Sequence, residues 1–99
     1  MNQSFLDVFN SRIQRLRQIV SVVDRVHGDH HPEFHDVKAL FNQLDHHVIE
    51  NEGTSLNEVF HALQEVSDHY RVPDDVCETY EAVYVMLKEL DQANGTYRE

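Results

Sequence analysis

Apolar side chains recur at intervals of three and four residues in four separate stretches of this chain. On an α-helix, that spacing gathers the side chains on one face, where they can be buried together. The stripes run from Phe5 to Val26, from Phe34 to Val48, from Leu56 to Tyr70 and from Val76 to Leu90. No stretch sustains an alternation of period two, so strands are not expected. The pattern predicts an all-α protein.

Residues that break helices separate the four stripes. Glycine and proline stand at Gly28 and Pro32, at Gly53, at Pro73 and at Gly95. Gly28 is expected to end the first helix in the left-handed conformation that glycine tolerates. The predicted helices span residues 4–27, 33–51, 56–70 and 74–93. Their connections are short, which predicts an up-down antiparallel four-helix bundle that forms one domain over residues 1–99.

The chain is acidic, with a formal net charge of −10 at pH 7. Its first 28 residues hold four arginines and two aspartates, whereas the rest hold four basic and sixteen acidic side chains. Nucleic-acid binding depends on the neutralisation of phosphates by lysine and arginine, so this balance argues against it. A mildly basic first helix packed against acidic neighbours accounts for the asymmetry.

The single cysteine, Cys77, cannot form an internal disulfide, and a reducing compartment is therefore expected. Because acidic residues surround it in the sequence, we expect Cys77 to be a small core residue and not a nucleophile. The first residues lack the basic and apolar segments of a signal peptide, and no apolar run approaches the roughly 20 residues of a membrane span. We expect a soluble, cytoplasmic protein that does not bind membranes.

Two short stretches combine histidines with carboxylates: "HGDHHPEFH" at residues 27–35 and "HHVIENE" at residues 46–52. Imidazole and carboxylate ligands suit a divalent ion such as iron, zinc or nickel. Eight histidines among eighteen carboxylates also produce chance pairs at helical spacing, and a hydrogen-bonded surface histidine explains any single pair. Either one weak mononuclear site or no metal at all is expected.

The predicted helix faces select the candidate metal ligands. His27 ends the first apolar stripe and should be half-buried. His47 lies in one row with Leu40 and Leu44 and should point inward. Acidic residues near His47 and histidines of the first loop would complete the coordination shell of the metal ion. The full predicted set is His27, His47, Glu50, Glu52, His30 and His31.

Three longer stretches read "VVDRVHGDHHP", "LFNQLDHHVIENE" and "VPDDVCETYEAVYVMLKEL". They resemble parts of the first, second and last helices of the hemerythrin-like domain of RIC or ScdA proteins, the di-iron family that repairs iron–sulfur clusters. The resemblance covers roughly residues 18 to 91. It implies a hemerythrin-like bundle, an iron pair held by histidines and carboxylates, and repair of clusters damaged by nitric oxide or oxidants under stress.

The resemblance carries over only part of the family's ligand set. The histidine at the end of the family's first helix matches His27, and its second-helix histidine matches His47. A shift of one position pairs His46 with Glu50 instead. Other ligand positions of the family fall on Leu6, Asn51, Gly53 and Tyr97. A single chain should therefore not build the family's di-iron centre.

Three hypotheses about function follow. The first is a degenerate hemerythrin-like module that binds a partner or regulates, without catalysis. The second is a metal-binding protein whose histidine and carboxylate site is rearranged or shared between subunits. The third is an acidic helical interaction protein whose histidines sense pH. The chain lacks a catalytic triad order, a glycine-rich phosphate loop and a paired-cysteine motif, so an enzyme is not expected. A protein partner is expected, and a homodimer and a monomer are expected equally.

Overall fold

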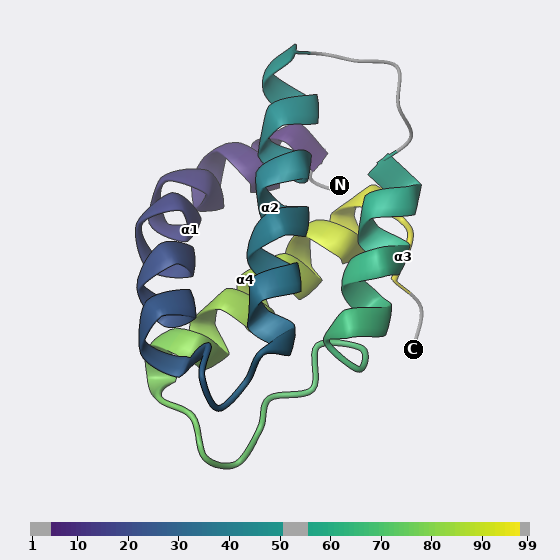
Figure 1. Cartoon of the computed structure of the whole chain (residues 1–99). Helices are drawn as coiled ribbons and strands as arrows, with labels where there is room; N and C mark the ends of the chain where they lie inside the picture. The colour runs from purple at the N-terminus through teal and green to yellow at the C-terminus, as the bar shows by residue number, and fades with distance from the viewer. Residues whose placement is uncertain (1–4, 51–55, 98–99) are drawn as a thin grey trace.

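The computed structural model describes residues 5–50 and 56–97. They form four helices, α1 (Phe5–His27), α2 (Glu33–Glu50), α3 (Leu56–Val66) and α4 (Glu78–Asn94), and contain no strand. α1 packs against α2 and α4, and α3 packs against the same two helices (Figure 1). α4 runs obliquely to the other three. The predicted all-α four-helix bundle is confirmed.

The core consists of the faces that the periodicity predicted, except that Val26, the last residue of the first predicted stripe, is exposed. Leu16, Leu44 and Leu63 come from three different helices and are fully buried. α4 adds two buried tyrosines, Tyr80 and Tyr84, whose hydroxyls hydrogen-bond to each other at 3.1 Å. Each hydroxyl thus has a partner, which a buried polar group requires. Apolar and tyrosine side chains therefore fill most of the interior of the bundle.

The end of α1 depends on glycine for a different reason from the one predicted. α1 ends at His27 as expected, but Gly28 does not adopt a left-handed conformation; Gly95 is the described glycine that does, and it ends α4. A Cβ atom at position 28 would clash with the backbone carbonyl oxygen of Asp24 and would lie 2.6 Å from the ring of His35. Glycine is required at this position because the last turn of α1, whose Asp24 carbonyl accepts the Gly28 N–H at 2.9 Å, leaves no room for a side chain.

α3 ends at Val66, four residues before its predicted end, because three consecutive residues leave the helical conformation. Asp68, His69 and Tyr70 have left-handed backbones with φ of 52°, 59° and 63°. That conformation costs about 1–2 kcal/mol for each residue other than glycine. Buried Ser67 supports the turn: its hydroxyl donates to the Leu63 carbonyl at 2.6 Å and accepts from the Tyr70 N–H at 2.9 Å.

α4 begins at Glu78, four residues later than predicted. Pro73 lies in the connection between α3 and α4, not in the first turn of α4. This connection crosses the end of the bundle from α3 towards α1, where α4 starts (Figure 1). Residues 71–77 cross it in a non-helical conformation, which spans more length per residue than the rise of about 1.5 Å in a helix. Cys77 is the N-cap residue of α4.

A buried carboxylate holds the end of α4 against the turn that follows α3. Asp91 is fully buried and accepts hydrogen bonds from the Tyr70 hydroxyl at 2.6 Å and the Gln64 amide at 2.9 Å. The Thr96 hydroxyl also donates to it. A buried charge without such donors would be strongly destabilising. The apolar periodicity did not predict this network, because Asp91 is a charged residue beside the buried face that Leu87 and Leu90 form.

The left-handed turn predicts an effect of glycine on stability. His69→Gly should raise the free energy of unfolding by about 0.5–1 kcal/mol, because glycine adopts a positive φ without a Cβ clash. His61→Gly is the matched control, since His61 is also exposed but lies within α3. This control should lower the free energy by about 0.5 kcal/mol. Urea denaturation measures both values, and a destabilised His69→Gly would contradict the role assigned to the turn.

The buried tyrosines predict loss of stability at alkaline pH. Burial raises the pKa of Tyr70, Tyr80 and Tyr84, and the hydrogen bond to Asp91 raises that of Tyr70 further. An unfolded tyrosine titrates near pH 10, so the contribution to stability is complete below that pH and is lost above it. The loss should reach up to about 1.4 kcal/mol per pH unit for each tyrosine that stays protonated in the folded state.

Denaturation curves at about pH 9 and about pH 11 measure this loss. Tyr84→Phe should reduce the slope, because one fewer phenol titrates on unfolding. A free energy of unfolding that does not change up to about pH 11 would contradict the prediction.

Candidate functional site

Two connections bring histidines, carboxylates and the cysteine together at one end of the bundle. The α1–α2 loop and the α3–α4 connection lie together at this end (Figure 1). Buried Tyr80 lies beneath them, with its ring centre 5.5 Å from that of His27 and 5.6 Å from that of His31. The two histidine rings are 6.5 Å apart. We call this surface the histidine end.

His27 is half-buried, as predicted, and its partner is the cysteine. Its Nε2 atom lies 3.2 Å from Sγ of Cys77. Cys77 is exposed, so the prediction of a core residue was wrong. The reason is its place at the start of α4, since an N-cap residue precedes the first helical turn and the buried face of α4 begins three residues later, at Tyr80.

His31 joins the two loops through two carboxylates. Its Nδ1 atom lies 3.0 Å from Glu33 Oε1, and its Nε2 atom lies 3.0 Å from Asp75 Oδ1. An ionised carboxylate only accepts hydrogen bonds, and a neutral imidazole donates only one. Both hydrogen bonds therefore form together only when His31 is protonated. Of the two contacts, the one with Asp75 links the α1–α2 loop to the α3–α4 connection.

The other two histidines of the first stretch lie nearer the surface. His30 is exposed. His35 is also exposed, and its Nδ1 atom lies 2.6 Å from Oδ1 of Asp24 in α1. Lys38 adds a longer contact of 3.8 Å to the same carboxylate. These contacts fasten α2 to α1 just behind the histidine end.

His47 lies at the opposite end of α2 from the histidine end. It is 14 residues beyond Glu33 in a continuous helix, a rise of about 21 Å. His47 is half-buried, and its ring lies 6.2 Å from that of His46. Glu50 is the last residue of α2, and Glu52 lies outside the described residues. The structure therefore places His27, His30 and His31 together but separates them from His47 within one chain.

The described residues do not fit a metal centre of the hemerythrin type. Nowhere in residues 5–50 and 56–97 do three histidine, cysteine or carboxylate side chains gather in a way that could hold a metal ion. At the histidine end, both nitrogens of His31 and the Nε2 of His27 already have other partners. Metal centres of four-helix bundles are built from ligands that project into the interior. In this bundle, apolar and tyrosine side chains occupy most of the described interior, and the buried carboxylate of Asp91 is taken up by hydrogen bonds from Tyr70 and Gln64.

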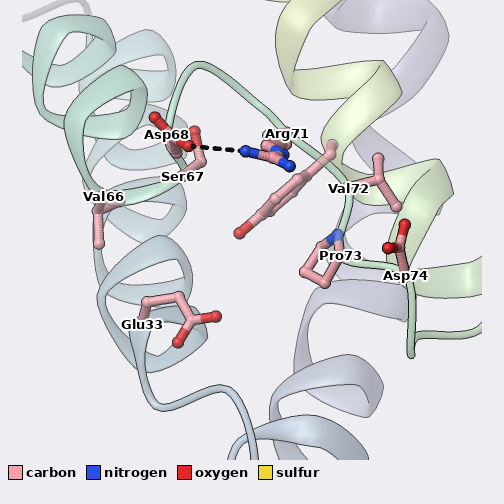
Figure 2. Close-up of a pocket in the computed structure, with 9 residues that line it drawn as sticks. Glu33, Val66, Ser67, Asp68, Arg71, Val72, Pro73 and Asp74 are labelled. Carbon is pink, nitrogen blue, oxygen red and sulfur yellow. Dashed lines mark ion pairs between the residues drawn. The ribbon is translucent and has the colours of Figure 1, made fainter.

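A pocket of about 390 Å³ opens beside the histidine end. Its apolar lining comes from α3, the connection and α4: Val66, Val72, Pro73 and Tyr84. Figure 2 shows Glu33 on one side of it and Asp74 on the other. Glu33 also contacts His31, so the pocket and the histidine end share a residue.

The charged groups around this pocket are mostly acidic. Glu33, Asp68 and Asp74 supply three carboxylates, and Arg71 supplies one cation. The guanidinium of Arg71 lies 4.0 Å from Asp68, but both side chains are strongly exposed, so this pair contributes little. The three carboxylates outnumber the one cation, and of the three Glu33 also contacts His31. We call this cavity the acidic pocket.

Sequence reasoning missed the residues that the α3–α4 connection contributes to this end. Asp75 and Cys77 contact histidines of the first stretch across more than forty positions of sequence. One signal was available, because the first and third connections of an up-down bundle lie at the same end. The acids and cysteine of "VPDDVC" could therefore have been placed beside "HGDHHPEFH".

Comparison of this chain with models of protein families, with curated proteins and with solved structures found no match. The resemblance to the hemerythrin-like domain of iron–sulfur repair proteins thus stays a prediction. In the part of the chain that the structure describes, no helix is both long and apolar enough to cross a membrane.

The separation of His27 from His47 predicts the outcome of metal titrations. Zinc or iron(II) bound weakly near one histidine should be unaffected by removal of the other, so His27→Ala and His47→Ala should alter different binding events. Isothermal titration calorimetry measures both, and absorption spectra detect an oxo-bridged pair. Two irons per chain with that absorption, or loss of the same ion in both variants, would contradict the prediction.

Proposed function

We propose that this chain is a non-catalytic, hemerythrin-like module that binds a protein partner through one end of the bundle and lacks the di-iron centre. The resemblance to iron–sulfur repair proteins and the four-helix architecture support the relationship. The filled interior supports the absence of the iron pair. The exposed, unpaired thiol of Cys77 fits a reducing compartment such as the cytoplasm.

The acidic pocket is the observation that carries this proposal. Its volume lies within the range of typical ligand sites, roughly 300–1,000 Å³. Apolar walls formed by Val72 and Pro73 suit the methylene stem of a lysine or arginine, and the carboxylates of Glu33 and Asp74 suit its charged head. The partner is therefore a protein segment that presents a basic side chain.

A pH-dependent form of this role is favoured by His31, which contacts Glu33 at the edge of the pocket. Histidine is the side chain that changes charge between about pH 5 and 8. When protonated, His31 pairs with Glu33 and competes with the partner's basic group for the same carboxylate. Binding should therefore be tighter at neutral pH than in mild acid.

A titration with a tri-lysine peptide, acetylated only at its N-terminus so that the lysine side chains stay charged, tests the pocket. We expect the amide resonances of Ser67, Val72 and Asp74 to shift in heteronuclear NMR spectra, because these residues line the site. A tri-glutamate peptide should leave them unchanged. The double variant Glu33→Gln with Asp74→Asn should lose the response, because it removes both carboxylates that attract the lysine.

The matched control is Asp7→Asn with Glu58→Gln, which changes the net charge equally but alters the first turns of α1 and α3. This control should bind the peptide as the wild type does. Equal loss of peptide binding in both double variants would show that overall charge causes the response and would contradict binding in the pocket. Titrations at about pH 7.5 and pH 5.5 test the role of His31. Binding by the wild type that is the same at both pH values would exclude it.

A further inference from the structure

The contact between Cys77 and His27 has no role in the proposed function. The thiol is exposed, and its sulfur lies 3.2 Å from Nε2 of His27, within hydrogen-bond distance for sulfur. Cys77 is the N-cap residue of α4, but its side chain makes no capping hydrogen bond. The sulfur is therefore directed to the imidazole and is not used to stabilise the helix. A nucleophile and a base thus lie side by side at the surface.

The fold holds His27 in position for this contact. Its ring stands edge-on to the ring of Tyr80, at 88° and with 5.5 Å between the ring centres. Tyr80 is fully buried, so it provides a rigid wall against which the imidazole packs. A nucleophile, a base within hydrogen-bond reach and a third group that orients the base are the components of an activated nucleophile.

We propose that Cys77 is an oxidant-reactive thiol and that His27 accepts its proton as it reacts with a hydroperoxide. The sulfur attacks one peroxide oxygen, the O–O bond breaks, and a sulfenic acid forms. The thiol proton passes to Nε2 of His27 and then to the departing oxygen, which leaves as water or an alcohol. The sulfur loses the two electrons that the peroxide gains.

The charges around the thiol select the kind of oxidant. Asp75 and Glu78 lie close to Cys77 in sequence, and Asp75 also contacts His31 at the same end. These carboxylates disfavour the approach of an anionic oxidant. An uncharged hydroperoxide is not repelled in this way.

The fate of the sulfenic acid follows from the cysteine content. The chain has no second cysteine, so an internal disulfide cannot form. A small-molecule thiol therefore reduces the sulfenic acid in two steps: the first forms a mixed disulfide and releases water, and the second releases free Cys77 and the disulfide of the small thiol. The oxidation is thus reversible.

The test measures the rate at which hydrogen peroxide forms the sulfenic acid, trapped with dimedone and counted by mass spectrometry. His27→Ala and His27→Gln should react about tenfold more slowly than the wild type. This is less than the roughly 100-fold that a fully enclosed general base supplies, because the pair is open to solvent. Cys77→Ser should give no adduct.

The matched control is His30→Ala, which removes an exposed histidine of the same loop. Its rate should equal that of the wild type. Free imidazole should restore part of the rate in His27→Ala, which a purely structural effect of the substitution would not allow. Circular dichroism checks that each variant is folded. Equal rates in the wild type and in a folded His27→Gln would overturn the proposal, as would an equal loss in His30→Ala.

Discussion

The ring of Tyr80 lies where the packed core meets the histidine end. On the core side, its centre is 5.0 Å from the ring of Phe34 and 4.9 Å from that of Tyr84, and on the other side it contacts the rings of His27 and His31. Aromatic pairs of this kind contribute about 0.5–1.5 kcal/mol each beyond the area they bury. The positions of both histidines therefore depend on packing within the core, which keeps them in place at an otherwise exposed surface.

The connection between α3 and α4 decides what those histidines contact. Three consecutive left-handed residues turn the chain away from α3, at a cost of several kcal/mol in total. Hydrogen bonds of Ser67 and of Tyr70, which reaches the buried Asp91, offset this cost. Because the chain turns there, the following segment crosses the end of the bundle. It brings Asp75 to His31 and forms one wall of the acidic pocket.

The histidine contacts with Cys77 and Asp75 and the acidic pocket thus lie at one end of this bundle and not along its axis. In a metal-bearing bundle, polar ligands replace apolar residues at facing interior positions. In this protein, fully buried side chains such as Phe34, Leu44 and Tyr84 fill the described interior, with the two tyrosine hydroxyls bonded to each other. Buried, satisfied groups of this kind stabilise the fold.

The sequence by itself determined the four helices, their buried faces and the ends of α1, because periodic apolar spacing and glycine act over a few neighbouring residues. It also placed His27 at the edge of the core. It did not determine where α3 ends or where α4 begins, since hydrogen bonds of Ser67 and Asp91 with Tyr70 favour a turn over the helix that the apolar stripe predicted. Nor did it determine the contacts of His27. Spacing along one helix defines a face, but only the packing of the helices decides which ends meet, and it placed His27 beside Cys77 and far from His47.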